Sequence, residues 1–181
     1  MRALKLMMAE GLRKTERKLP FLGYERRFRF RAVEEGKLYR ASLPTPKALG
    51  YFRKVYGIAS LVIVLRELER YEYEVDFARK NGITIHHIPL SHRSPTDQEV
   101  KTFFAFVDDP KNQPVLLHCY SGKDRTGCFA LLWRVERLGW DVRKAWKEMK
   151  ELGHCAMPWE PLHFGYFKNW LESRYNTLLK G

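Results

Sequence analysis

The chain has 181 residues, of which 45% are hydrophobic and 30% charged, and its formal net charge is +12. This length and composition suit one folded domain with its own core and exclude a largely disordered chain. No apolar stretch approaches the roughly 20 residues that cross a bilayer, and charges interrupt the first ten residues, so we expect neither a transmembrane segment nor a secretory signal. Three cysteines without paired spacing argue against a disulfide scaffold, and we expect a cytoplasmic protein.

The positive charge is concentrated near the start of the chain, where residues 1–40 hold twelve Lys and Arg against five Glu. Such a field attracts polyanionic substrates or acidic surfaces; the alternative is a solvated basic surface without a partner. No zinc-finger, homeodomain or RNA-recognition motif accompanies the charge, so we expect no obligate nucleic-acid partner. We assign residues 1–181 to a single domain, with residues 1–25 as a basic N-terminal extension that packs on it and residues 153–181 as a C-terminal helical segment.

Two patterns precede the main body of the domain. Leu4, Met7, Met8 and Leu12 recur at helical spacing and predict a helix packed on the domain, with a membrane-surface helix as the alternative. Residues 26–31, Arg-Arg-Phe-Arg-Phe-Arg, alternate basic and apolar residues and predict a half-exposed edge strand, although arginine interleaved with aromatic rings also suits stacking on nucleic acid.

From residue 37 onward, β-rich apolar runs alternate with amphipathic segments. Pro46 suits the start of one helix and Gly57 its end. The predicted strands cover residues 37–40, 61–65, 83–88 and 115–117, and the predicted helices cover 46–56, 68–80, 96–108, 127–138, 141–152 and 160–175. This alternation predicts an α/β fold with a central, mostly parallel sheet of four to five strands flanked by helices.

The most informative stretch is residues 118–127, His-Cys-Tyr-Ser-Gly-Lys-Asp-Arg-Thr-Gly, between a predicted strand and a predicted helix. A tight loop that enters a helix aims its backbone N–H groups and the helix dipole at one point, which suits a tetrahedral anion such as phosphate or sulfate. Gly122 allows the bend that such a loop needs, and Arg125 can grip two phosphate oxygens with its planar guanidinium.

The same field favours the ionised form of a thiol, so we expect Cys119 to be a thiolate nucleophile. Thr126 can donate its hydroxyl to the sulfur, and His118 is expected to turn toward the backbone and fix the loop. The spacing Cys-x5-Arg alone is weak evidence, because it occurs again from Cys128 to Arg134 with an apolar, helical filling. The surrounding His, Gly, Lys and Thr-Gly make the first match specific.

The sequence HCYSGKDRTG resembles the phosphate loop of the cysteine-dependent tyrosine and dual-specificity phosphatases, and in particular an atypical microbial branch similar to bacterial tyrosine/lipid and inositol phosphate phosphatases. The resemblance begins at Leu38–Pro44, continues through Val62–Arg66 and extends to about Leu152. It implies a dual-specificity-phosphatase-like fold and a phosphomonoester hydrolase that works through a cysteinyl-phosphate, without a metal or other cofactor.

The resulting site has a catalytic group and a substrate-binding group. We assign the catalytic group to Cys119, Arg125, Asp124 and Thr126, and the substrate-binding group to Tyr120, Ser121, Gly122, Lys123 and His118. The general acid stays open between Asp124, which the resemblance favours, and Asp97, which also suits a helix start. His92 stands where related dual-specificity enzymes carry an aspartate.

The substrate also stays open. Lys123 adds more positive charge than one phosphotyrosine requires, which favours an inositol phosphate or phosphoinositide headgroup over a phosphotyrosine or phosphoserine protein. Arg93 and Lys101 are further basic candidates near the mouth. The alternatives to an enzyme are a catalytically weak phosphate- or inositol-phosphate-binding module and a basic RNA-binding protein with 5′-phosphatase activity. We expect a monomer.

Overall fold

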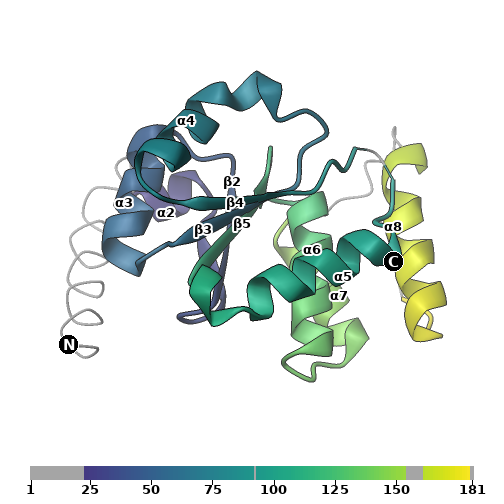
Figure 1. The fold of residues 1–181 in the computed structure, drawn as a ribbon. Coiled ribbons are helices and arrows are strands. Elements are labelled where there is room, and N and C mark those ends of the chain that lie inside the picture. Colours follow the sequence, from purple (N-terminus) through teal and green to yellow (C-terminus); the bar gives the residue numbers. More distant parts are fainter. Residues whose placement is uncertain (1–22, 92, 154–160, 180–181) are drawn as a thin grey trace.

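The computed structural model describes residues 23–91, 93–153 and 161–179. The predicted N-terminal helix and most of the 1–25 extension therefore lie outside the described residues, as does His92. The described chain forms a mixed α/β fold around one five-stranded sheet (Figure 1). Its strands are β1 (Arg31–Glu34), β2 (Leu38–Ser42), β3 (Ser60–Ile63), β4 (Thr84–His87) and β5 (Val115–Cys119).

The helices alternate with these strands as predicted, and their bounds shift by a few residues. They are α2 (Tyr24–Arg27), α3 (Pro46–Tyr56), α4 (Glu72–Lys80), α5 (Asp97–Asp108), α6 (Asp124–Glu136), α7 (Val142–Glu151) and α8 (Pro161–Tyr175), with short 3₁₀ turns η1 (Glu69–Tyr71) and η2 (Pro110–Asn112). In Figure 1, α3 and α4 lie on one side of the sheet and α5, α6 and α7 on the other.

The strand order is β1-β2-β5-β3-β4, and every pair except β1 with β2 is parallel. The structure thus confirms the predicted mostly parallel sheet. β5 lies in the middle, with Cys119 opposite Ser42 of β2 and His118 opposite Ile63 of β3. The carboxyl ends of these three strands therefore meet at one edge, where the chain order reverses. Open α/β sheets bind their ligands at such switch points.

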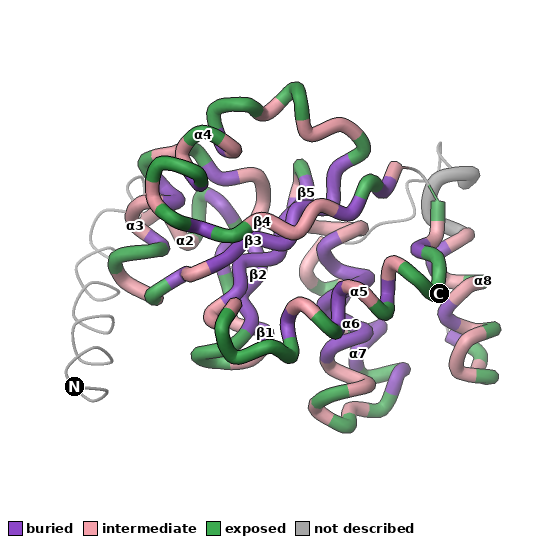
Figure 2. Tube along the Cα trace, viewed as in Figure 1, coloured by how far each residue is buried: buried purple, intermediate pink, exposed green. Residues whose placement is uncertain are grey.

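Burial explains why β3 and β5 read as continuous apolar runs. Every residue of these two strands is buried, whereas β4 at the sheet edge is only partly covered (Figure 2). On the side of the sheet covered by α5, α6 and α7, Phe103, Phe129 and Trp133 pack together in the core, with the ring centroids of Phe103 and Phe129 4.9 Å apart. This packing holds the middle of α6 against α5.

The predicted edge strand at residues 26–31 is wrong. The chain forms the short helix α2 there, bends at Arg29, whose φ is +54°, and begins β1 only at Arg31. The apolar residues of this stretch are buried as the alternation indicates, since Phe28 and Phe30 both lie in the core. Both rings pack on Phe52, however, because the backbone bends between them and does not continue as a strand. Glu25 holds α2 in place, since its carboxylate accepts hydrogen bonds from Tyr51 at 2.7 Å and Tyr56 at 2.8 Å.

Candidate active site

The turn from β5 into α6, residues 119–125, is here called the Cys119 loop. Its carbonyl groups are held by the protein: Tyr120 O accepts from the Leu43 N–H at 3.1 Å, and Gly122 O accepts from Arg40 Nη2 at 2.7 Å. The backbone N–H groups of residues 120–123 donate no hydrogen bond to the described residues. With its carbonyls tied back and its N–H groups open, the loop can accept an anion at the start of α6.

Gly122 is required by the shape of this loop. Its φ is +69°, and a Cβ on it would lie 2.6 Å from both Ala41 O and Ser42 N. Any side chain would therefore overlap the backbone at the end of β2. The bend predicted for Gly122 is present, and its cause is this close approach of two backbone segments.

Arg40 is a site residue whose position the sequence did not reveal. It is 4% exposed, it lies on β2 opposite Leu117, and its guanidinium also reaches Lys123 O at 3.4 Å. Burial lowers the pKa of Arg40 to about 10, and its electrostatic interaction with Cys119 acts in the opposite direction. Arg40 thus brings a buried positive charge to the side of Cys119, which is itself only 1% exposed.

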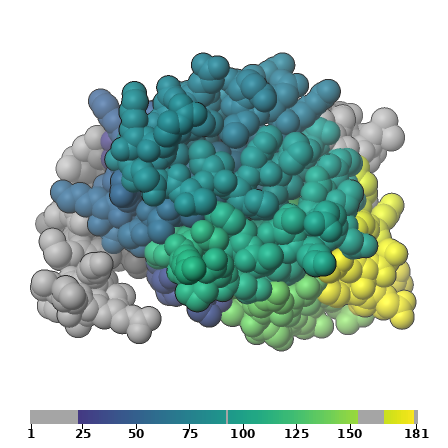
Figure 3. All heavy atoms as spheres, viewed as in Figure 1, coloured from purple at the N-terminus to yellow at the C-terminus, as the bar shows by residue number. Residues whose placement is uncertain are grey.

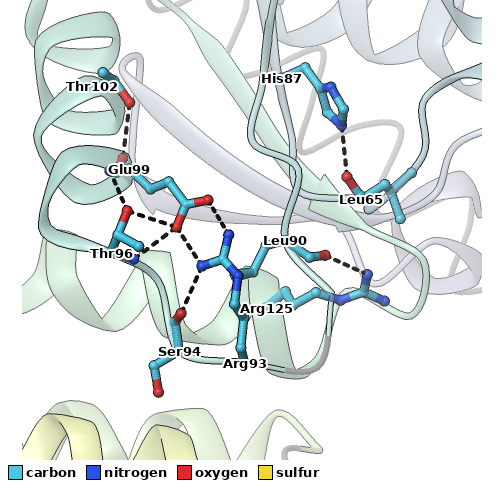
Figure 4. A network of polar contacts seen from close by, with 9 residues as sticks. All are labelled: Leu65, His87, Leu90, Arg93, Ser94, Thr96, Glu99, Thr102 and Arg125. Carbon is cyan, nitrogen blue, oxygen red and sulfur yellow. Dashed lines mark hydrogen bonds and ion pairs between the residues drawn. The ribbon is translucent and has the colours of Figure 1, made fainter.

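Arg125 lies in the first turn of α6, and its Nη1 donates to Leu90 O at 3.3 Å (Figure 4). Together with Tyr120, which is 64% exposed, it lines a hollow of about 280 Å³. Arg66 and Arg70 line the same hollow from the segment after β3. Three arginines therefore line the hollow beside the Cys119 loop, together with Glu67, which pairs with Arg66 at 3.6 Å and with Arg70 at 2.6 Å.

His118, which the sequence assigned to the substrate-binding group, has its side chain in the protein interior. Its side chain is completely buried: Nδ1 lies 3.3 Å from Cys119 O, and Nε2 lies 2.9 Å from Oε1 of the equally buried Glu74 on α4. This second contact has ion-pair distance without the alignment of a hydrogen bond. The expected turn of His118 toward the backbone is confirmed, and Glu74 is a neighbour that no sequence signal indicated.

Thr126 is buried in the first turn of α6, and its hydroxyl has no hydrogen-bond partner among the described residues. The expected donation from Thr126 to the Cys119 sulfur is thus not made in this structure. A buried hydroxyl without a partner is costly, so this group is available to a bound ligand or to the sulfur after a side-chain rotation.

The two candidate acids lie in different surroundings. Asp124 is the first residue of α6, half-buried, and Tyr166 of α8 lies near enough to feel its charge and that of Arg125. Asp97 is the first residue of α5, its side chain is 92% exposed, and its Oδ1 accepts from Arg174 Nη1 at 3.1 Å. In Figure 3, α8 in yellow lies against this part of α5.

Arg93, which the sequence suggested near the mouth, is engaged elsewhere. Its guanidinium donates to both carboxylate oxygens of Glu99, at 2.7 and 2.6 Å, and to Ser94 O (Figure 4). Glu99 in turn forms a capping box with Thr96 at the start of α5. Arg93 therefore belongs to the helix cap and has little freedom to bind a ligand.

Among the described residues, no group of three or more His, Cys, Asp or Glu is placed to hold a metal ion. Cys128 is completely buried on α6, and burial raises the pKa of its thiol, so it has the environment of a packed core residue. Within the same described ranges, no helix is both long and apolar enough to cross a membrane.

The chain matches the model of the tyrosine phosphatase family over residues 26–155. It belongs to this family. It is 26% identical over 98 residues to inositol diphosphatase SIW14 of Saccharomyces cerevisiae, which covers 51% of this chain and 34% of that protein. It is also 26% identical over 117 residues to dual specificity protein phosphatase TpbA of Pseudomonas aeruginosa, which covers 64% of this chain and 51% of that protein.

The fold agrees with this membership of the tyrosine phosphatase family. The crystal structure of the core catalytic domain of the PP-IP phosphatase SIW14 from S. cerevisiae aligns with 83% of this chain and 96% of that one, with a TM-score of 0.64 and 22% sequence identity. The resemblance predicted from the HCYSGKDRTG stretch is confirmed at the level of family and fold. The chain spans about a third and about half of the lengths of the two curated relatives, SIW14 and TpbA.

Proposed function

We propose that this protein is a cysteine-dependent phosphatase that removes phosphate from an inositol phosphate or a related phosphorylated molecule. The observation that carries the proposal is the Cys119 loop itself. Its N–H groups are open, Arg40 stands beside the cysteine, and Arg125 follows in the first turn of α6. Membership of the tyrosine phosphatase family supports the same chemistry.

In the first step, the Cys119 thiolate attacks phosphorus and forms an S–P bond as the bond from phosphorus to the leaving oxygen breaks. The departing oxygen takes a proton from the general acid. In the second step, the deprotonated general acid takes a proton from water as that water attacks the same phosphorus, the S–P bond breaks, and inorganic phosphate and the thiolate are released. Arg125 and the N–H groups of residues 120–123 stabilise the phosphoryl oxygens in both steps.

We assign the general acid to Asp124 in preference to Asp97. Asp124 directly precedes Arg125 and is half-buried, whereas Asp97 is exposed and bound to Arg174 on α8. Asp124→Asn is expected to lower kcat on an inositol phosphate about 10²-fold or more. The same substitution should lower kcat much less on an aryl phosphate, because that leaving group needs no proton. Asp97→Asn is the matched control, and an equal effect of both changes on the two substrates would contradict the assignment.

An inositol phosphate is the preferred substrate class because positive charge surrounds the loop. Lys123 lies within it, Arg40 beneath it, and Arg66 and Arg70 line the adjoining hollow. One of the relatives is named as an inositol diphosphatase and another as a dual specificity protein phosphatase, so phosphotyrosine remains in the test set. A thiolate nucleophile works in a reducing compartment, which supports a cytoplasmic location.

The test is phosphate release from inositol polyphosphates, phosphoinositides, phosphotyrosine peptides, nucleotides and an aryl phosphate. Cys119→Ser is expected to abolish release and to retain binding of tungstate, a phosphate mimic. Cys128→Ala is the control, because it removes the thiol at the other Cys-x5-Arg position without adding a polar group to the buried core, and it should keep turnover. Binding without release in the unaltered protein would instead indicate a phosphate-binding module.

A further inference from the structure

A second basic pocket adjoins the Cys119 loop on the side of β1 and β2. It measures about 110 Å³ and is lined by Arg29, Arg31, Arg40, Gly122, Glu151 and Gly153, among others. Neither Tyr120 nor Arg125 lines it. This pocket, called the arginine pocket below, is thus distinct from the hollow beside Arg125, and no residue lines both.

Positive charge exceeds negative charge in this pocket, where three arginines face one lining carboxylate, that of Glu151. Arg31 and Arg40 are directly opposite each other on β1 and β2, so their side chains leave the same face of the sheet. Like charges in that arrangement destabilise a sheet. The side chains of Arg29 and Arg31 make no hydrogen bond or ion pair within the described part of the chain, and the acidic lining residue Glu151 lies 3.9 Å from Lys147 Nζ.

Gly153 leaves room at one wall of the pocket, because it has no side chain. A Cβ on Gly153 would lie 3.7 Å from Arg29 Nη1 and 3.2 Å from Lys123 Cε, so the Arg29 and Lys123 side chains both approach this glycine. Arg29 itself has a positive φ, which is uncommon for a residue with a side chain. Arg40 reaches the pocket while it is almost completely buried. A desolvated guanidinium flanked by two unpaired ones is the arrangement that recognises a phosphate group.

We propose that the arginine pocket binds a second phosphate group, separate from the one at Cys119. Phosphate brings two negative charges against the three guanidinium groups and relieves the repulsion between Arg31 and Arg40. Because Arg40 also holds Gly122 O, a ligand there would act on the residue that positions the Cys119 loop. The phosphate can come from inorganic phosphate or from a polyphosphorylated molecule.

The experiment uses the full chain with Cys119→Ser, in which binding is measured without turnover, so its outcome does not depend on the proposed enzymatic activity. The protein is titrated calorimetrically with inorganic phosphate and with inositol hexakisphosphate. Arg31→Gln is expected to remove the second of two phosphate sites or to weaken hexakisphosphate binding about tenfold or more. The matched control is Arg26→Gln, which removes an exposed arginine that does not line the pocket.

Weaker binding of either ligand by the Arg31→Gln protein supports the proposed phosphate site. A loss confined to inositol hexakisphosphate identifies a polyphosphorylated molecule as the source of the bound phosphate group. Equal binding by the Arg31→Gln and Arg26→Gln proteins, with both ligands, would overturn the proposal. Glu151→Gln provides a gain that misfolding cannot imitate, because it removes the competing carboxylate and should tighten phosphate binding several-fold. Unchanged affinity in Glu151→Gln would also count against the pocket.

Discussion

At the scale of single residues, Gly122 is the most constrained position in the site. Its positive φ could be tolerated by another residue at some cost, but the space for a Cβ is already occupied by the backbone of Ala41 and Ser42. Neither segment can move without disturbing the pairing of β2 with β5, which joins Ser42 to Cys119. The geometry of the loop is therefore built into the sheet.

Gly122→Ala is expected to lower the free energy of unfolding by roughly 2–4 kcal/mol and to reduce kcat on an aryl phosphate by about 10²-fold, because the donors of the loop move. Gly36→Ala is the control: Gly36 has φ +77° with nothing within 4 Å of a Cβ, so only backbone strain of about 1 kcal/mol applies. Urea unfolding and steady-state rates check both. Equal losses in the two variants would refute this account of the loop.

The residue scale also shows what sequence patterns leave out. Cys119, Gly122 and Arg125 follow from the spacing within one short stretch. Arg40 stands in a stretch that also resembles the family, yet its contact with Gly122 is made across 82 positions of the chain. Glu74 reaches His118 from α4. No periodicity in the nearby sequence indicates which distant residue such a side chain contacts, because strand pairing and helix packing determine that contact.

At the scale of elements, the start of α5 is a compact polar network beside the site (Figure 4). The hydrogen bonds from Arg93 hold the pKa of Glu99 below its ordinary value, with Thr96 contributing as well, while partial burial opposes them. The folded protein thus favours the ionised carboxylate. The stabilising effect of the ionised Glu99 carboxylate is complete above its ordinary pKa of 4.5. This effect is lost as the pH falls through the lower pKa that Glu99 has in the folded protein.

Glu99→Gln should therefore flatten the dependence of the unfolding free energy on pH in the acid range and lower stability at neutral pH. Chemical denaturation between pH 7 and pH 3 measures this. Glu69→Gln makes the same change at an exposed residue of η1 and should leave the pH dependence intact. A steep acid loss that persists unchanged in Glu99→Gln would show that this network does not stabilise α5.

Helix limits were predictable where the signal is local. Pro46 and Gly57 bound α3, and the capping box of Thr96 and Glu99 opens α5. Residues 26–31 were mispredicted because alternation reports burial and not backbone shape. Phe28 and Phe30 are both buried, but the bend at Arg29 and the hydrogen bonds from Tyr51 and Tyr56 to Glu25 favour a short helix before the strand.

At the scale of the whole molecule, the sheet order brings together strands that are distant in sequence. β5 enters between β2 and β3, so its carboxyl end faces two other strand ends at the point where the order reverses. The alternating pattern of strands and helices predicted a parallel α/β class, but the sequence contains no marker of which strand lies in the middle. Cys119 is instead recognisable as the centre of the site from the residue types of the loop that follows β5.

The net charge of +12 is a property of the whole chain with a kinetic consequence. Long-range attraction raises encounter rates for polyanions and is screened by salt. We expect kcat/KM for an inositol polyphosphate to fall at least about tenfold between 0.02 and roughly 0.3 M salt. The value for an aryl phosphate should fall much less, because that substrate carries less charge. Equal salt dependence for both substrates would argue against electrostatic selection.

The central claim is that Cys119 becomes covalently phosphorylated during turnover. Rapid acid quench of the unaltered protein with a ³²P-labelled substrate, followed by peptide mapping, measures it most directly. Label is expected on the peptide that contains Cys119, formed before phosphate release and absent from Cys119→Ser. Release of phosphate by the Cys119→Ser protein, or label on any other residue, would contradict it.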